Sequence, residues 1–107
     1  MNYATLDDFL RDLPALAREH RQELEGRAAL ILLQTNQGRS VLVRLRDGEV
    51  TFPTSCGEEP ECTIIAGEED LMGIIAGKLN PAMALMFGKV KIKGNPKPLL
   101  ELISLIK

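Results

Sequence analysis

The first part of the chain has apolar residues at steps of three and four, as on one face of an amphipathic helix. This pattern predicts a helix from about Thr5 to Glu25. Thr5 is a residue type that caps helix N-termini, and Asp7 and Asp8 in the first turn favour a helix start. Pro14 predicts a break or a kink, so we expect either one bent helix or two short ones.

The pattern then changes to that of strands. Residues 27–34 form a continuous apolar run, which is typical of a strand covered on both faces. Apolar and polar residues alternate over 41–46 and again over 50–52, and Asp47-Gly48 between them is a two-residue hairpin turn. Tight turns join these three strands, so they are expected to be antiparallel. Residues 62–66 predict a fourth strand.

Helices and one further strand are predicted after residue 66. Acidic residues favour a helix start in the segment 67–77, which ends at a glycine. Asn80-Pro81, a cap followed by proline at the first helical position, begins another helix, and Gly88 ends it. Residues 89–93 alternate and predict a fifth strand. The apolar stripe of residues 95–107 predicts a last helix.

The predicted fold is a single α+β domain with a five-stranded, antiparallel-rich sheet covered on one face by helices. The 107 residues suit one domain, and 45% hydrophobic and 26% charged residues are proportions of a globular protein. Its parts are an N-terminal helical segment, the first four strands, two helices, a strand and a C-terminal helix, at residues 1–26, 27–66, 67–88, 89–94 and 95–107.

Composition argues against several partners and locations. The net charge of −2 and the 4% aromatic content argue against a nucleic-acid partner. Apolar runs are shorter than the roughly 18–20 residues of a membrane span, and Met1–Leu10 lacks a basic-then-apolar secretion signal. The expected location is the cytoplasm, where Cys56 and Cys62 stay reduced.

The residues that carry chemistry predict no catalytic or metal site. His20 lies in a charged run and is expected on a solvated helix face, and one histidine with two cysteines is too few for zinc. Cys62, in an alternating strand, is expected to be a small buried apolar residue. The acidic residues between Glu58 and Asp70 would suit acid–base work, but a solvated loop and a helix start is the favoured interpretation. We therefore expect no enzyme activity and no cofactor.

The most informative motifs lie between Glu69 and Lys97. They are Gly77-Lys78-Leu79-Asn80-Pro81 and Phe87-Gly88-Lys89-Val90-Lys91-Ile92-Lys93-Gly94, preceded by Cys62-Thr63-Ile64-Ile65 and the hairpin Arg46-Asp47-Gly48. Together they resemble the sterol carrier protein type 2 (SCP2) domain family, over about Leu30 to Ile106. The resemblance implies an apolar tunnel between the sheet and the helices. Family members bind or transfer fatty acids, acyl-CoA, sterols or phospholipids, and others are accessory domains in larger enzymes or assemblies.

We therefore expect a non-catalytic lipid carrier that holds a fatty acid, acyl-CoA or similar long-chain ligand in this tunnel. An empty pocket of ~300 Å³ would cost ~7 kcal/mol, so such a pocket must collapse or hold something apolar. On spacing alone, Met83 and its neighbours suit a core and a pocket wall equally. The candidate ligand-binding residues are Val43, Leu45, Phe52, Ile64, Leu71, Ile75, Met83, Met86, Phe87, Leu99 and Ile103.

The last helix and a lysine stripe leave alternatives open. The helix has a broad apolar face, since Glu101 is the only charge between Lys97 and Lys107. It is expected to cover a tunnel mouth, to contact a second chain as in a homodimer, or to touch a bilayer, and burial within the domain is an equal alternative. The lysines of residues 89–93 favour edge-strand protection over transient contact with a membrane surface. The alternative function is a protein-interaction or accessory domain with a filled tunnel, associating through this helix.

Overall fold

The computed structural model describes residues 3–54, 57, 59–95 and 97, which form four helices and five strands in the part of the chain that it describes. In chain order these are α1 (Leu6–Glu19), α2 (Arg21–Leu24), β1 (Ala28–Thr35), β2 (Ser40–Arg46), β3 (Glu49–Thr51), β4 (Cys62–Ala66), α3 (Glu68–Ile75), α4 (Pro81–Met86) and β5 (Val90–Gly94). Apart from Asn95 and Lys97, the predicted last helix lies outside the described residues.

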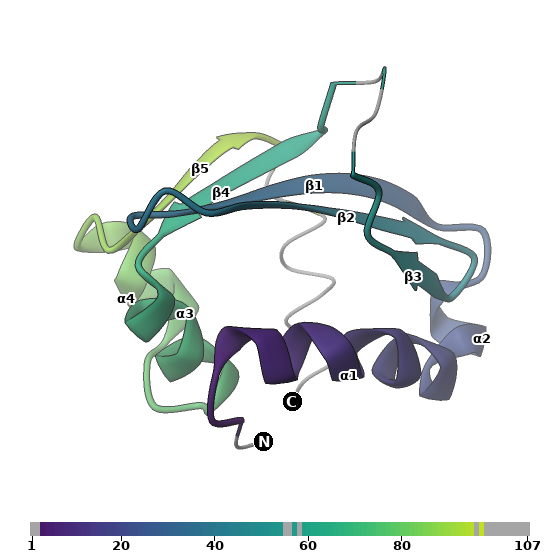
Figure 1. Ribbon diagram of the computed structural model, residues 1–107, viewed down its shortest axis with the longest axis horizontal. Helices are drawn as coiled ribbons and strands as arrows, with labels where there is room; N and C mark the ends of the chain where they lie inside the picture. The colour runs from purple at the N-terminus through teal and green to yellow at the C-terminus, as the bar shows by residue number, and fades with distance from the viewer. Residues whose placement is uncertain (1–2, 55–56, 58, 96, 98–107) are drawn as a thin grey trace.

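The strands form one mixed sheet in the order β3-β2-β1-β4-β5. β1 pairs antiparallel with β2 and parallel with β4, and the two remaining pairs are antiparallel. The helices α1, α3 and α4 lie on one side of this sheet (Figure 1). The predicted α+β class, with a mostly antiparallel sheet and helices on one face, is confirmed.

The strand register decides which side chains face the helices. Ile31 of β1 lies opposite Val43 of β2 and Cys62 of β4, and Leu33 lies opposite Ile64. All five side chains are buried, because alternate residues of neighbouring strands project to the same face. The run of residues 27–34 alone left this choice of face open.

The N-terminal helical segment is interrupted at a different residue from the one predicted. Pro14 lies inside α1, and the helix continues to Glu19, with α2 beginning after His20. Of the two outcomes predicted at Pro14, a break or a kink, the break is therefore wrong. Proline removes one hydrogen bond from the helix, but the buried leucines on either side of it hold α1 against the sheet. The cap was placed correctly, since the Thr5 hydroxyl accepts from the Asp8 backbone N–H at 3.2 Å.

The hairpin between β2 and β3 has the predicted two-residue turn. Asp47 and Gly48 have φ values of 49° and 82°, as a type I′ turn requires. The Asp47 carboxylate also accepts from the Gly26 backbone N–H at 2.8 Å. The turn is thereby tied to the segment between α2 and β1.

Candidate functional site

An apolar cavity of about 100 Å³ lies between the sheet and the helices α1, α3 and α4. Every residue that lines it in the described part of the chain is apolar. The lining consists of Leu6, Phe9, Leu10 and Leu13 of α1, Ile31, Leu33, Val43, Ile64 and Val90 of the sheet, Leu71, Ile74 and Ile75 of α3, and Pro81 and Leu85 of α4. Such a wall has no hydrogen-bonding side chain to offer, so it suits hydrocarbon.

Four of the residues predicted to bind a ligand meet in this cavity. Val43 and Ile64 come from the sheet, and Leu71 and Ile75 come from α3. Leu45 is buried in the same core but lies outside the cavity lining. Leu99 and Ile103 lie outside the described residues.

The expected pocket wall on α4 is corrected by the structure. Met83, Met86 and Phe87 do not line the cavity and are exposed. Pro81, Ala84 and Leu85, spaced as i, i+3 and i+4, form the inward stripe of the helix instead. This leaves the other side of α4 to face solvent.

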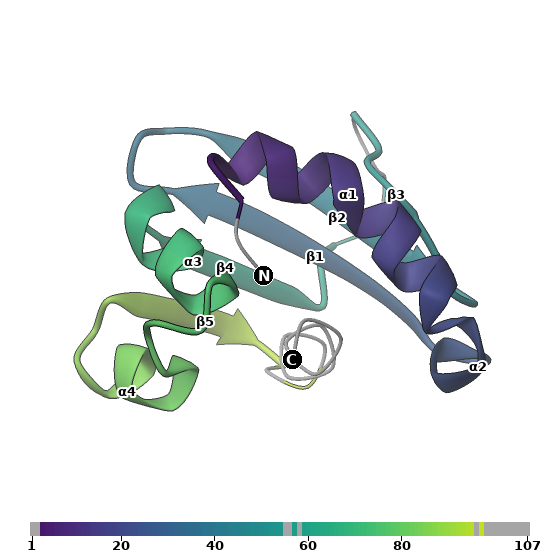
Figure 2. The ribbon, with the colours of Figure 1, turned by 90° about the horizontal axis from the view of Figure 1, so that it is seen from below.

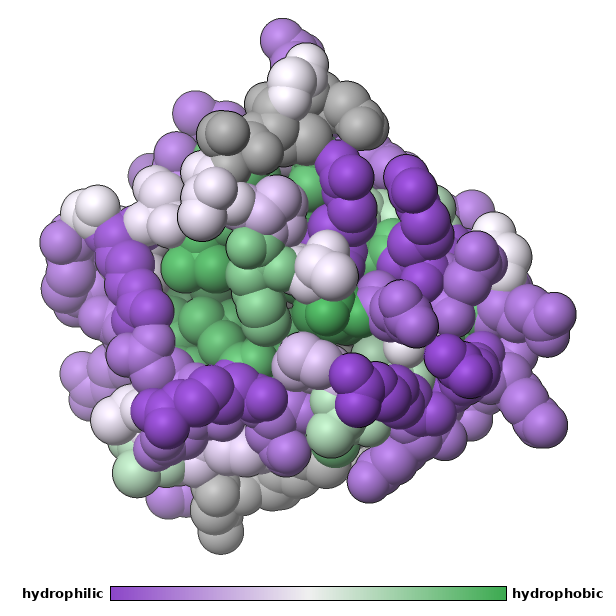
Figure 3. Space-filling model, turned by 45° about the vertical axis from the view of Figure 1, so that its right-hand side comes forward, coloured by the Kyte–Doolittle hydropathy of each residue, from purple (hydrophilic) through white to green (hydrophobic). Residues whose placement is uncertain are grey.

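Phe52 also lies away from the cavity. It borders a shallow depression with Leu32 and Leu42, which the register places on the sheet face opposite the helices. With the β3 side of the molecule turned forward, the surface shows an apolar area bordered by hydrophilic residues (Figure 3). Exposed apolar surface is therefore found on more than one side of the domain.

The contribution of α1 was missed as part of the site. Its Leu6, Phe9, Leu10 and Leu13 follow the i, i+3, i+4, i+7 spacing of one helix face. The sequence showed this stripe but not which strands or helices it faces. Figure 2 shows α1 lying across the sheet beside α3, so the stripe forms one wall of the cavity.

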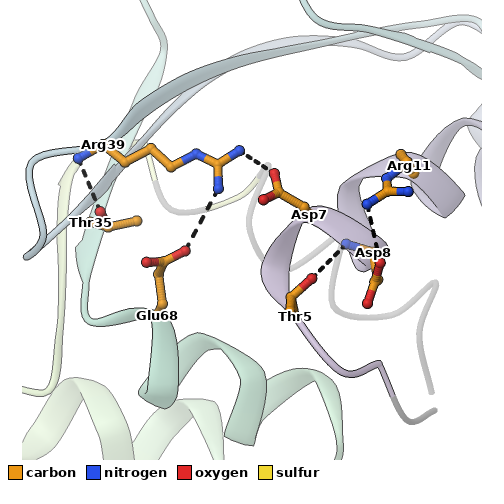
Figure 4. A network of polar contacts seen from close by, with 7 residues as sticks. All are labelled: Thr5, Asp7, Asp8, Arg11, Thr35, Arg39 and Glu68. Carbon is orange, nitrogen blue, oxygen red and sulfur yellow. Dashed lines mark hydrogen bonds and ion pairs between the residues drawn. The ribbon is translucent and has the colours of Figure 1, made fainter.

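Polar contacts join the N-termini of α1 and α3 to the turn between β1 and β2 (Figure 4). The Arg39 guanidinium donates to the Asp7 carboxylate on α1 and lies 3.7 Å from a carboxylate oxygen of Glu68 on α3. The Arg39 backbone N–H donates to the Thr35 hydroxyl at 3.1 Å. The hydrogen bond from Arg39 holds the pKa of Asp7 below its usual value. Arg39 thus connects the sheet with both helices beside the lining residue Leu6.

The profile of the SCP-2 sterol transfer family matches residues 6–107. The chain belongs to this family. The resemblance drawn from the sequence motifs is confirmed, and the family profile includes the α1 stripe.

The sequence matches to curated relatives cover about half of this SCP-2 domain. Sterol carrier protein 2 of Gallus gallus is 33% identical over 54 residues, which is 50% of this chain and 10% of that protein. Sterol carrier protein 2 of Arabidopsis thaliana is 37% identical over 54 residues, which is 44% of that protein. The chain therefore spans only part of the relatives that it matches.

Solved structures contain the same fold both as most of a chain and as a small part of one. The sec-alkylsulfatase Pisa1 from Pseudomonas sp. matches with a TM-score of 0.82 and 25% identity over 94% of this chain and 16% of that chain. The sterol carrier protein domain 2 of Helicoverpa armigera matches with a TM-score of 0.65 and 24% identity over 92% of this chain and 84% of that one. A palmitated SCP2L2 from Aedes aegypti has a TM-score of 0.63 at 19% identity, over 95% of this chain and 94% of that one.

The remaining chemistry of the SCP-2 domain is sparse where the structure describes it. Cys62 is fully buried, and burial, followed by the nearby Glu61, raises the pKa of its thiol. It is the small buried apolar residue that the sequence predicted. Within residues 3–54, 57, 59–95 and 97, no cluster of three or more His, Cys, Asp or Glu residues could hold a metal ion, and no helix is long and apolar enough to cross a bilayer.

Proposed function

We propose that this SCP-2 domain binds one long-chain apolar ligand, such as a fatty acid or an acyl-CoA, in the cavity and does no chemistry on it. The observation that carries the proposal is the apolar lining of the cavity by α1, α3, α4 and the sheet. A wall of this kind gains about 0.8 kcal/mol for each methylene group it removes from water. It selects for hydrocarbon and leaves a polar head group outside the cavity.

From the cavity volume we infer that the space between the sheet and the helices is narrower without a ligand than with one. At ~24 cal/mol per Å³, an empty cavity of about 100 Å³ costs about 2.4 kcal/mol, which a domain with a stability of ~5–15 kcal/mol tolerates. Ligand sites usually measure about 300 Å³ or more, and that volume would cost about 7 kcal/mol when empty. The ligand therefore widens the space as it enters.

Widening requires the helices to move away from the sheet. The strands are held to one another by continuous backbone hydrogen bonds, whereas α1 and α3 pack on the cavity through apolar side chains. The Arg39 ion pairs to Asp7 and Glu68 lie at the surface, where solvent screening leaves such pairs with little effect on stability. Burial of about ten methylene groups, at about 8 kcal/mol, outweighs both costs.

The names of related proteins support a lipid ligand. The family carries the description of sterol transfer, and the protein from Aedes aegypti that shares the fold is named as palmitated. Among the described residues, the cavity wall consists of aliphatic residues, Phe9 and a proline. We favour a bendable acyl chain because such side chains adapt to it more easily than to a rigid ring system.

Two valine variants test the proposal. Val43 lines the cavity, and Val50 is a buried valine of the same sheet that does not. We expect the protein as purified to retain a lipid that native mass spectrometry detects, and to bind a fluorescent fatty acid. Val43→Phe should weaken that binding at least tenfold, and Val50→Phe should leave it nearly unchanged. A wild-type protein that neither retains lipid nor binds the probe would remove the proposal, and equal losses in both variants would remove this cavity as the site.

A second candidate function is that of an accessory domain with a filled tunnel. It is favoured by the match to 16% of the Pseudomonas sulfatase chain and to 10% of the chicken protein, in which the domain is a small part of a larger protein. Association would then use the predicted helix 95–107. Deleting residues 99–107 distinguishes the two functions. A lost interface changes the mass measured by light scattering, while a lost gate changes the rate of fatty-acid exchange.

A further inference from the structure

The outward side of α4 carries a cluster of exposed apolar side chains between lysines. We propose that Met83, Met86 and Phe87, with Lys78 and Lys89, form a docking surface for anionic lipid bilayers. We call these five residues the α4 surface. The proposal concerns the outside of the helix and does not require the cavity to hold a ligand.

The apolar side chains of the α4 surface are exposed to solvent. Met83, Met86 and Phe87 are 49%, 79% and 65% exposed. Single exposed apolar residues are common on soluble domains, but three large ones at the end of one short helix form a patch. Figure 2 shows α4 at the periphery of the molecule, beside β5 and away from α1 and α2. Nothing in the described part of the chain covers this side of α4.

The surrounding charge is positive although the whole chain has a net charge of −2. Five lysines and no acidic residue occur from Leu71 to Lys97 inclusive. Lys78 precedes α4, and Lys89 follows it with its backbone N–H donating to the Ala84 carbonyl at 2.9 Å. Both lysines are exposed. The lysine nearest the helix end is therefore held beside the apolar cluster by the backbone.

This combination matches an anionic bilayer surface. Met and Phe side chains enter the boundary between head groups and acyl chains, while lysines extend to the anionic head groups. A stable protein partner would normally bury about 1,200–2,000 Å² in total, more than two side chains on a six-residue helix and one directly after it supply. The charge and the small area together favour a lipid surface over a protein surface.

The α4 surface is also continuous with the cavity wall. Leu85 lines the cavity and is 39% exposed. Pro81 and Leu85 belong to the inward stripe of the helix whose outward stripe carries Met83 and Met86. A bilayer bound at α4 would therefore lie directly outside one wall of the cavity.

A tryptophan reporter tests the contact directly, because the chain has no tryptophan of its own. Phe87→Trp places the reporter in the α4 surface. Phe52→Trp places a matched reporter at another exposed phenylalanine, which lies outside the α4 surface. On addition of vesicles of equal parts phosphatidylcholine and phosphatidylglycerol, emission of the Phe87→Trp protein should shift to shorter wavelength. Brominated acyl chains should quench it. An unchanged spectrum, or an equal response from the Phe52→Trp protein, overturns the proposal.

Sedimentation with the same vesicles measures the contribution of each part. Met86→Ser with Phe87→Ser should weaken binding at least about tenfold, and Lys78→Gln with Lys89→Gln should weaken it about fivefold for each lysine. Arg11→Gln, which removes an exposed charge from α1, should leave binding unchanged. Circular dichroism checks that each variant is folded.

Two outcomes of these experiments decide between a lipid surface and a protein interface. If the wild-type protein does not bind the vesicles but forms a dimer that the Met86→Ser and Phe87→Ser changes dissociate, the α4 surface is a protein interface instead. If vesicle binding is lost in those variants while fatty-acid binding persists, the docking surface holds independently of the proposed cavity ligand.

Discussion

At the scale of single residues, Gly94 at the end of β5 has no room for a side chain, whereas Gly38 has room for one. Both have φ near the same left-handed value, +87° and +85°. A Cβ on Gly94 would lie 2.4 Å from the Glu61 carbonyl oxygen, while a Cβ on Gly38 would meet open space. We expect Gly38→Ala to lower the free energy of unfolding by about 1–2 kcal/mol and Gly94→Ala by roughly 2–4 kcal/mol. Urea unfolding measures both, and equal costs would show that the backbone at Glu61 moves to admit the added carbon.

The two valine variants proposed for the binding test should also differ in thermal stability. Val50→Phe overpacks a closed part of the core, which typically costs about 1–3 kcal/mol. Val43→Phe adds its volume beside the cavity of about 100 Å³, so part of the empty-cavity cost of about 2.4 kcal/mol is recovered. The expected order of thermal stability is therefore Val43→Phe above Val50→Phe. The reverse order, measured by calorimetry, would mean that the space beside Val43 cannot admit the ring.

Residue-level predictions from the sequence succeeded where the reason was local. Thr5 caps α1 and Cys62 is buried as the alternation required. They failed where a neighbour decided the outcome. Met86 and Phe87 have the composition of a pocket wall, but Ala84 is buried and Leu85 lines the cavity, and this turns Met86 and Phe87 outward.

At the scale of elements, Arg39 gives the attachment of α1 a pH dependence. Its hydrogen bond lowers the pKa of Asp7 from the ordinary value of 3.8. A lowered folded-state pKa means that the stabilisation is present above about pH 4 and is lost as the pH falls through the folded-state value. Arg39→Gln should therefore reduce stability at neutral pH but flatten its decline in acid.

A matched control for Arg39 is available within α1. Arg11 pairs with Asp8 at 3.3 Å, three residues apart in the same helix. Arg11→Gln therefore removes an ion pair that lies within one helix and does not connect two elements. Thermal unfolding between pH 3 and pH 7 compares the two variants in buffers of low salt, because screening weakens surface pairs. If Arg11→Gln flattens the acid decline as much as Arg39→Gln does, the Asp7 contact contributes nothing of its own.

Element types followed the sequence more closely than element boundaries or orientations. The sequence predicted the three helices that line the cavity and all five strands. Helical spacing indicated α1, alternation indicated β2, β3 and β5, a continuous apolar run indicated β1, and start signals indicated α3 and α4. The six residues of α4 are too few for periodicity to distinguish an inward stripe from an outward one. The continuation of α1 through Pro14 likewise depends on packing, since proline alone favours a break.

At the scale of the whole molecule, binding to the cavity should couple to folding. A ligand that binds only the folded state at a hundred times its Kd adds about 2.7 kcal/mol of stability. For a domain of this size that corresponds to a rise in Tm of about 10 °C or more. Calorimetry with a saturating long-chain fatty acid should show this rise for the wild-type protein and a smaller one for Val43→Phe. A Tm that no chain length moves would contradict the proposed function.

The local features and the family of this protein could be predicted from the order of its residues. The Asp47-Gly48 turn, the Asn80 cap and the SCP-2 motifs depend on residues close together in the chain, where backbone conformation and short hydrogen bonds settle the outcome. Three features became visible in the folded domain alone: the parallel pairing of β1 with β4, the cavity wall from α1 and the outward face of α4. Each of these depends on which distant surfaces pack together, and packing is settled by the complete set of apolar faces rather than by any one segment.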